Sequence, residues 1–96
     1  MKVLAIGHPR RGVDVGTEIP KHARAEMETL WGMYTNGFVR EMYSPGGPGA
    51  ILVVEAPTGD EALAGLASLP LVANGLVDFD VVELHPFAAL EALFPA

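Results

Sequence analysis

The sequence predicts an α+β fold in which two helices cover one face of a four-stranded antiparallel sheet. Four short segments rich in Val, Ile, Leu and aromatic residues are typical of strands, and two longer segments carry apolar residues at helical spacing. These segments follow one another in the order β-α-β-β-α-β. With 96 residues, the chain has the size of one domain, which we expect to span residues 1–96.

The first half of the chain is predicted to form one strand and one long helix. Residues 3–7 are apolar and β-branched, whereas residues 8–12 break the strand and begin a loop. A helix is then expected from residue 17 or 18 to about residue 36. Pro20 suits its first turn, and Gly37 supplies a C-terminal stop.

A hairpin and a second helix are expected next. Residues 38–43 and 50–56 have the composition of strands, and the turn between them is dense in Pro and Gly. Thr58 is a suitable N-cap for the second helix, and Pro70 is expected to end it.

The last part of the chain is predicted to add a fourth strand and a short helix. Residues 77–84 alternate between acidic and apolar side chains, and residues 86–94 are expected to be helical. The order β-α-β-β-α-β is that of ferredoxin-like folds, in which both helices pack on the same face of the sheet.

The third strand indicates that something covers the other face of the sheet. Its run Ile51-Leu52-Val53-Val54 is apolar on both faces, as in strands that are buried on both sides. The same face of a second copy would cover it in an isologous homodimer, which is the arrangement of a dimeric α+β barrel. The alternative is a monomer whose C-terminal segment folds back over the sheet.

Composition narrows the classes of partner. The formal net charge is −6, and no basic stripe with interleaved aromatic residues is present, which argues against nucleic acid. The longest apolar run is too short to cross a membrane. The absence of Cys excludes disulfides, thiolate nucleophiles and Cys metal sites, and it fits a cytoplasmic protein.

The first helix holds the clearest candidate for a functional residue. At about 100° per residue, Glu26 falls inside an apolar stripe, whereas Glu28 lies on the opposite face with Lys21. The stripe consists of Ile19, Ala23, Met27, Leu30, Trp31, Met33 and Tyr34.

The position of Glu26 allows a chemical role and a structural one. Burial of a carboxylate is costly, and it raises the pKa of the group toward neutrality, where it can act as an acid or a base. His22 lies four residues earlier, at a spacing where helical side chains meet, and could relay a proton. In the structural alternative, Glu26 only accepts a hydrogen bond from Tyr43, Arg40 or a backbone amide.

Charged residues outside this helix provide weaker candidates. Arg10 and Arg11, close to His8, could bind a substrate carboxylate, because Arg suits bidentate recognition. The alternative is a solvated loop. Asp78 and Asp80 share a face of the last strand but match no metal-ligand spacing, so no metal site is predicted.

Aromatic residues could form the walls of a pocket. Trp31, Tyr34 and Tyr43 are the candidates, although aromatic side chains at helical spacing more often belong to a core.

One block in the second half of the chain has a more specific pattern. Leu69-Pro70-Leu71 is followed by a turn, by the acidic and apolar strand Asp78-Phe79-Asp80-Val81 and by Pro86. Together with the features before it, this block resembles the muconolactone isomerase-like family over roughly residues 18–87. Those features are a helix ending in Gly37, a strand with Arg40 and Tyr43, and an Ala-rich helix at Glu61-Ala62.

The resemblance implies a ferredoxin-like subunit in a dimeric α+β barrel, in some members within a larger oligomer. It also implies proton transfer on a small unsaturated lactone in aromatic compound catabolism, with no metal or organic cofactor. The family's proposed proton shuttle is a helix carboxylate, which falls on Glu26 when counted back from Gly37. The family's Lys one turn earlier is replaced here by Ala23.

The leading hypothesis is therefore a muconolactone isomerase-like enzyme that catalyses intramolecular proton transfer on a small anionic organic molecule. Glu26 would be the base and His22 would tune or relay the proton. The predicted substrate contacts are Arg10, Arg11, Trp31, Tyr34, Arg40 and Tyr43. The alternatives are a non-catalytic small-molecule binding or assembly module, and a cofactor-independent monooxygenase of the same barrel fold.

Overall fold

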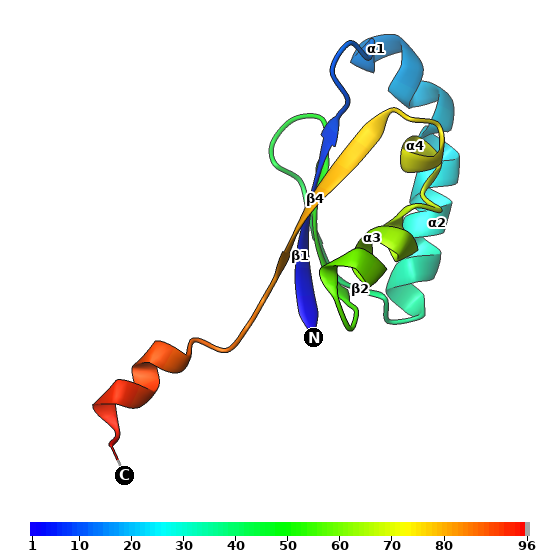
Figure 1. Cartoon of the computed structure of the whole chain (residues 1–96). Helices are drawn as coiled ribbons and strands as arrows, with labels where there is room; N and C mark the ends of the chain where they lie inside the picture. The colour runs from blue at the N-terminus through cyan, green and yellow to red at the C-terminus, as the bar shows by residue number, and fades with distance from the viewer. Residues whose placement is uncertain (96) are drawn as a thin grey trace.

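An antiparallel sheet with helices on one face forms the body of the computed structural model, which describes residues 1–95 (Figure 1). The strand order is β2-β3-β1-β4, and neighbouring strands are antiparallel. The predicted ferredoxin-like α+β fold is therefore confirmed. In chain order the elements are β1 (Lys2–Pro9), α1 (Val15–Glu18), the 3-10 helix η1 (Ile19–His22), α2 (Ala23–Thr35), β2 (Val39–Tyr43), β3 (Ala50–Glu55), α3 (Gly59–Leu66), α4 (Pro70–Ala73), β4 (Val77–Glu83) and the 3-10 helix η2 (Ala88–Leu93).

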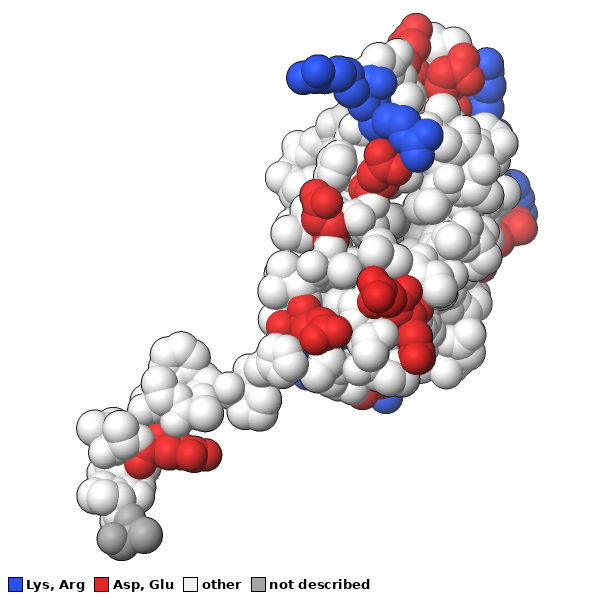
Figure 2. Space-filling model, in the orientation of Figure 1, with Lys and Arg blue, Asp and Glu red and all other residues white. Residues whose placement is uncertain are grey.

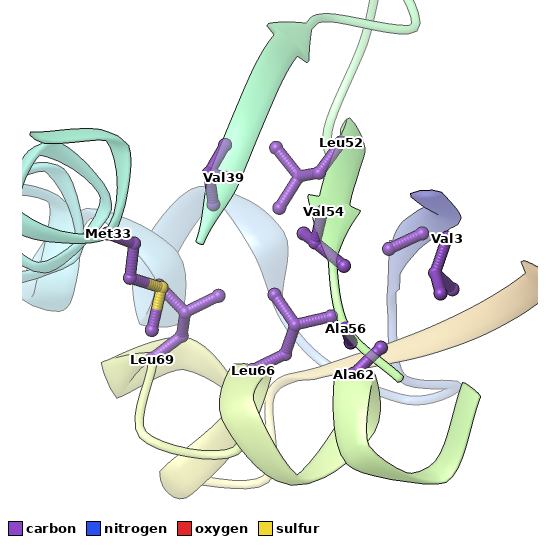
Figure 3. Close-up of a cluster of buried hydrophobic side chains, with 10 residues drawn as sticks. Val3, Met33, Val39, Leu52, Val54, Ala56, Ala62, Leu66 and Leu69 are labelled. Atoms are coloured by element: carbon purple, nitrogen blue, oxygen red, sulfur yellow. The ribbon is translucent and has the colours of Figure 1, made fainter. Parts of the chain in front are cut away.

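The hydrophobic core lies between the sheet and the helices (Figure 3). Alternate residues of the two central strands point into it, namely Val3 and Ala5 of β1 and Leu52 and Val54 of β3. Each of these four side chains is at most 1% exposed. The helix side of the core contributes Met33, Ala62, Leu66 and Leu69.

The first strand is longer than the sequence pattern predicts. A loop is expected from His8 onward, but β1 continues to Pro9, which pairs with Val77 of β4. Proline is tolerated there because β1 is paired with β3 only as far as Gly7, so the strand has a neighbour on one side alone. His8 therefore belongs to the sheet and not to the loop that follows it.

The helices are also divided differently from the prediction. The first helix is interrupted by the 3-10 turn η1, because Pro20 has no N–H to donate to the helical hydrogen-bond ladder. The second helix, α3, ends at Leu66, and Pro70 begins a new helix, α4, at the position where helices best accept proline. None of the helices in residues 1–95 combines the length and hydropathy needed to cross a bilayer.

The face of the sheet away from the helices, here called the open face, carries a strip of apolar side chains. Ile6, Val82 and Leu84 on it are 41–52% exposed. The strip consists of Leu4, Ile6, Ile51, Val53, Val82 and Leu84.

The C-terminal segment does not fold back over this face. Residues 84–95, here called the C-terminal arm, extend away from the body to the lower left of Figure 1, and the predicted terminal helix forms as the 3-10 helix η2. The arm lengthens the molecule to 59 × 28 × 22 Å. The radius of gyration of 15.6 Å exceeds the value of about 12.5 Å expected for a compact chain of this length. The monomer alternative with a folded-back segment is therefore wrong for residues 1–95.

The N-cap of α3 provides a first testable prediction. The Thr58 hydroxyl accepts a hydrogen bond from the Glu61 amide at 3.1 Å, as predicted for a cap. Thr58→Ala is expected to lower the free energy of unfolding by about 0.5–2 kcal/mol, as measured by urea denaturation. Thr58→Ser keeps the hydroxyl and should lose clearly less; equal losses would contradict the role of the cap.

Candidate functional site

Glu26 is the only charged side chain among residues 1–95 that is buried, with 6% of its surface exposed. It lies in the first turn of α2, and its burial confirms the prediction from helical periodicity. Its Oε1 accepts a hydrogen bond of 3.0 Å from the Leu71 amide. That amide lies in the first turn of α4, where N–H groups have no partner within the helix. Glu26 therefore links α2 to α4.

The second carboxylate oxygen of Glu26 is open to other partners. Oε2 makes no hydrogen bond within residues 1–95, and no buried side-chain oxygen or nitrogen in this range lacks a partner. Oε2 must therefore reach solvent. Oε1 is thus engaged by the Leu71 amide, whereas Oε2 is accessible.

A pocket of about 200 Å³ opens beside Glu26. Its volume is below the range of about 300–1,000 Å³ that is usual for larger ligands, so it suits a molecule of about one ring. Glu26 is its only ionisable group. The other lining residues are apolar: Ile19, Met27, Leu30, Pro48, Gly49, Ala50, Leu71, Val77 and Phe79.

Two glycines shape the walls of this pocket. Gly7 and Phe79 pair across β1 and β4, and a Cβ at residue 7 would lie 2.7 Å from the Phe79 ring. The ring therefore occupies space that a side chain at residue 7 would need. Gly49 has a φ of +118°, and a Cβ there would clash with the carbonyl oxygen of Gly7. Only glycine at this position allows the loop between β2 and β3 to approach the backbone of β1 this closely.

The electrostatic environment of Glu26 favours acid–base chemistry. Burial raises the pKa of its carboxyl group above the usual value, and the hydrogen bond from Leu71 and the nearby His22 oppose this shift only in part. A carboxyl group with a raised pKa takes up and releases protons closer to neutral pH than an exposed one.

The raised pKa predicts a specific pH dependence of stability. Between the ordinary pKa of Glu26 and its raised value in the folded state, the folded protein binds more protons than the unfolded one. The stability due to this group is therefore fully present below the ordinary value and is lost as pH rises through the folded pKa. Urea denaturation of the wild type and of Glu26→Gln from about pH 4 to about pH 8 measures the difference. As pH rises, the free energy of unfolding of the variant should increase relative to that of the wild type. Parallel curves would contradict the raised pKa of Glu26.

His22 lies close enough to Glu26 to influence the pKa of its carboxyl group. Its charge favours the ionised form of the Glu26 carboxyl, yet no hydrogen bond or ion pair joins the two side chains. The role of His22 as a proton relay stays a prediction.

The two arginines predicted to bind an anion do not line the pocket. Arg10 is held by Asp78 through two hydrogen bonds, Nε to Oδ2 at 3.1 Å and Nη2 to Oδ1 at 2.8 Å. These bonds hold the pKa of Asp78 below its usual value. Arg11 lies exposed in the turn after β1. Anion binding by either residue stays a prediction.

Trp31 and Tyr34 stand on the outer surface of α2, away from the Glu26 pocket. Their rings stack with centroids 5.8 Å apart, and the side chains are 63% and 45% exposed. The apolar stripe of this helix is thus wider than the face that it buries, which centres on Glu26 and Met33.

Tyr43 borders a second cavity, of about 300 Å³, between α2 and the end of β2. Its hydroxyl donates a hydrogen bond to Glu41 at 2.8 Å. Arg40, at an irregularity in β2, lies 4.0 Å from a carboxylate oxygen of Glu55. The two cavities are adjacent, since four residues line both: Met27, Leu30, Gly49 and Ala50.

Sequence reasoning missed one side-chain pair and two residues that line the pocket. His8 Nε2 lies 3.0 Å from Asp80 Oδ2 on the open face, a pair that becomes visible only when β1 extends past Gly7. Phe79 and Leu71 at the pocket were also missed. The alternation of residues 77–84 places Phe79 on the helix side of the sheet and could have identified it.

Comparisons with known proteins support the fold. No family model matches this chain, and no curated protein does. Among solved structures it is similar to the 5-chloro-2-hydroxyhydroquinone dehydrochlorinase TftG from Burkholderia phenoliruptrix AC1100, determined in complex with 2,5-dihydroxybenzoquinone. The TM-score is 0.64 at 19% sequence identity, over 88% of this chain and 94% of the other. At this identity the likeness establishes that the two chains share a ferredoxin-like α+β fold.

Proposed function

We propose that this chain is an enzyme that moves a proton within a small organic molecule, as muconolactone isomerase-like enzymes do. The observation that carries the proposal is the Glu26 carboxyl group, buried and with a raised pKa, which lines an apolar pocket and keeps one oxygen open. A positioned acid–base group of this kind typically contributes about 10²–10⁴-fold to a rate.

The pocket supports a particular class of substrate. It is apolar and has room for about one ring, so the reacting carbon would lie on a small ring next to a carbonyl group, which acidifies the C–H bond. Glu26 Oε2 would take that proton and return it at another carbon, while the Leu71 amide holds Oε1 in place. The lining has no cation, so a carboxylate on the substrate would remain at the pocket mouth.

The structural likeness to a small-molecule enzyme also supports the proposal. TftG is named as a dehydrochlorinase and was determined with a dihydroxybenzoquinone. Loss of HCl removes a proton as well as chloride, so a reaction of this class, like the proposed one, includes the removal of a proton.

Proton NMR in D2O tests the proposed reaction. The wild-type chain is incubated with muconolactone, and isomerisation or loss of C–H signal by deuterium exchange is the expected result. A parallel incubation with a chlorinated hydroquinone, in which released chloride is measured, tests for elimination of HCl. Absence of both reactions would exclude these two substrates and favour a chain that binds a small molecule without transforming it.

We also propose that the chain is a homodimer joined through the open face. The exposed apolar strip on this face supports the proposal, because monomers rarely leave contiguous apolar surface uncovered. Light scattering should give twice the chain mass of 10.1 kDa. Replacement of Val82, which is 52% exposed, by Asp should shift the mass toward that of one chain. A wild type that scatters as a single chain would exclude the homodimer.

A further inference from the structure

Beside the Glu26 pocket, three residues form a row across three neighbouring strands. Gly7 of β1 pairs with Phe79 of β4 on one side and with Ala50 of β3 on the other. Gly7 continues the alternation of the buried residues Val3 and Ala5, so the row lies on the helix side of the sheet. The phenyl ring of Phe79 is therefore the one large side chain in this row.

The missing side chain at residue 7 makes room for that ring. A Cβ on Gly7 would lie 2.7 Å from Cε1 and 2.8 Å from Cζ of Phe79. Carbon atoms that are not bonded to each other pack at about 3.5–4.0 Å. The ring therefore lies directly against the backbone of β1, in the space that a side chain would otherwise fill.

Phe79 belongs both to the core and to the lining of the pocket. Its half-buried side chain packs against the hydrophobic core between the sheet and the helices. It also lines the pocket together with Ala50 and with Val77, the preceding residue on the same side of β4. Ala50 and Val77 are smaller, so Phe79 contributes the largest side chain that the sheet presents to the pocket.

We propose that Phe79 sets the size limit of the site, because its ring fills the space into which a second fused ring of a ligand would extend. The inference rests on the proposed function only in taking the Glu26 pocket as the place where the substrate binds. An apolar cavity of about 150 Å³ is enough to hold benzene. The pocket of about 200 Å³ thus admits one ring, and removal of the Phe79 ring adds space for another.

An apolar wall of this kind discriminates strongly between ligands of different size. One methylene more or less in a hydrophobic pocket changes specificity by about 10–200-fold. A fused aromatic ring adds four carbon atoms to a one-ring ligand. Removal of the wall should therefore change the preference for two rings over one by at least about tenfold.

Uncharged probes separate the effect of ring size from that of charge. The chain has a net charge of −6, and Figure 2 shows Asp and Glu side chains spread over the face in view, whereas Lys and Arg gather mainly at its upper end. Repulsion of an anion would have no relation to size. Phenol and 2-naphthol are both neutral near pH 7, carry one hydroxyl group each and differ by one fused ring. The amide signal of Leu71, which donates to Glu26, reports their binding by NMR.

Removal of the ring is the first test. In Phe79→Ala the affinity for 2-naphthol relative to that for phenol should rise at least about tenfold over the wild-type ratio. Phe79→Leu keeps an apolar side chain in the core but has no ring, and it should change the ratio in the same direction by a smaller factor. The second variant decides the matter if the first does not fold.

Phe38→Ala is the matched control for the loss of a ring. Phe38 is also half-buried, and its ring also lies against a glycine, since a Cβ on Gly65 of α3 would lie 2.5 Å from it. Phe38 borders a different cavity, between α2 and α3, and does not line the Glu26 pocket. Its replacement should leave the ratio of the two affinities unchanged.

Gly7→Ala tests the same wall in the opposite direction. The φ of Gly7 is not positive, so the backbone accepts alanine, and the added Cβ should displace the Phe79 ring toward the helices and into the pocket. The affinity for phenol should fall several-fold, and this fall should disappear when Phe79→Ala is added. Gly65→Ala displaces the Phe38 ring in the same way and should leave phenol binding unchanged.

The outcomes distinguish the size limit from the proposed chemistry. An unchanged ratio in both Phe79 variants, an equal rise in Phe38→Ala, or no binding of phenol at Leu71 in the wild type would overturn the size limit. A changed ratio in a chain that catalyses no deuterium exchange would support the size limit and argue against proton transfer. Exchange by a chain whose ratio does not respond to Phe79 would do the reverse.

Discussion

Replacement of Glu26 by Gln is expected to lower the rate of proton transfer by about 10²–10⁴-fold, the usual contribution of one acid–base group. An amide cannot exchange a proton as a carboxyl group does. The Gln side-chain oxygen can still accept the hydrogen bond that Leu71 donates to Glu26, so the fold should be retained. The measurement is the initial rate of deuterium exchange into the substrate, with circular dichroism to establish that the variant is folded.

Glu28 provides the matched control for this experiment. It lies on the same helix but on the solvent side, where Arg24 holds it at 3.0 Å. Glu28→Gln should therefore keep the wild-type rate. Full activity of Glu26→Gln, or an equal loss in Glu28→Gln, would remove Glu26 from the reaction.

Leu66→Ala is expected to cost about 2–5 kcal/mol of unfolding free energy, because it removes a fully packed side chain and leaves a cavity. Leu66 is 1% exposed and faces the sheet from α3, among the side chains shown in Figure 3. A domain of this size has about 5–15 kcal/mol in total, so the variant should unfold at much lower urea concentration.

Leu63→Ala tests whether this loss comes from the core, because Ala is at least as good a helix former as Leu and no loss is expected from helix propensity. Leu63 belongs to the same helix but is 38% exposed, so it should lose far less stability than Leu66. Similar losses for the two variants would contradict the assignment of the Leu66 loss to burial in the core.

The topology and the burial of Glu26 could be predicted because they follow from local periodicity. One turn of helix spacing is enough to place Glu26 among apolar residues, and alternation is enough to separate Phe79 from Asp78 on β4. The hydrogen-bond partner of Glu26 could not be predicted. Leu71 is far along the chain, and its amide becomes available only because Pro70 starts a helix instead of ending one.

The surroundings of the site depend on contacts that no local pattern reveals. The pairing of His8 with Asp80 needs the register of β1 against β4. The pairing of Arg10 with Asp78 needs the same register. It gives Arg10 a carboxylate partner on β4, whereas the sequence alone shows only a cationic loop. Trp31 and Tyr34 show the limit of helical periodicity. The apolar stripe identifies which residues are apolar on one side of the helix, but it does not show which of them another element covers.

The order of strands in the sheet has a consequence for synthesis on the ribosome. β1 is made first and lies in the middle of the sheet, yet its neighbours β3 and β4 are made much later. The β2-β3 hairpin can form from local contacts, whereas the sheet closes only when residue 83 has emerged and β4 has paired along β1. Until then the apolar residues of β1 have a partner on one side at most. The nascent chain thus completes its sheet in a late step, immediately before the arm emerges.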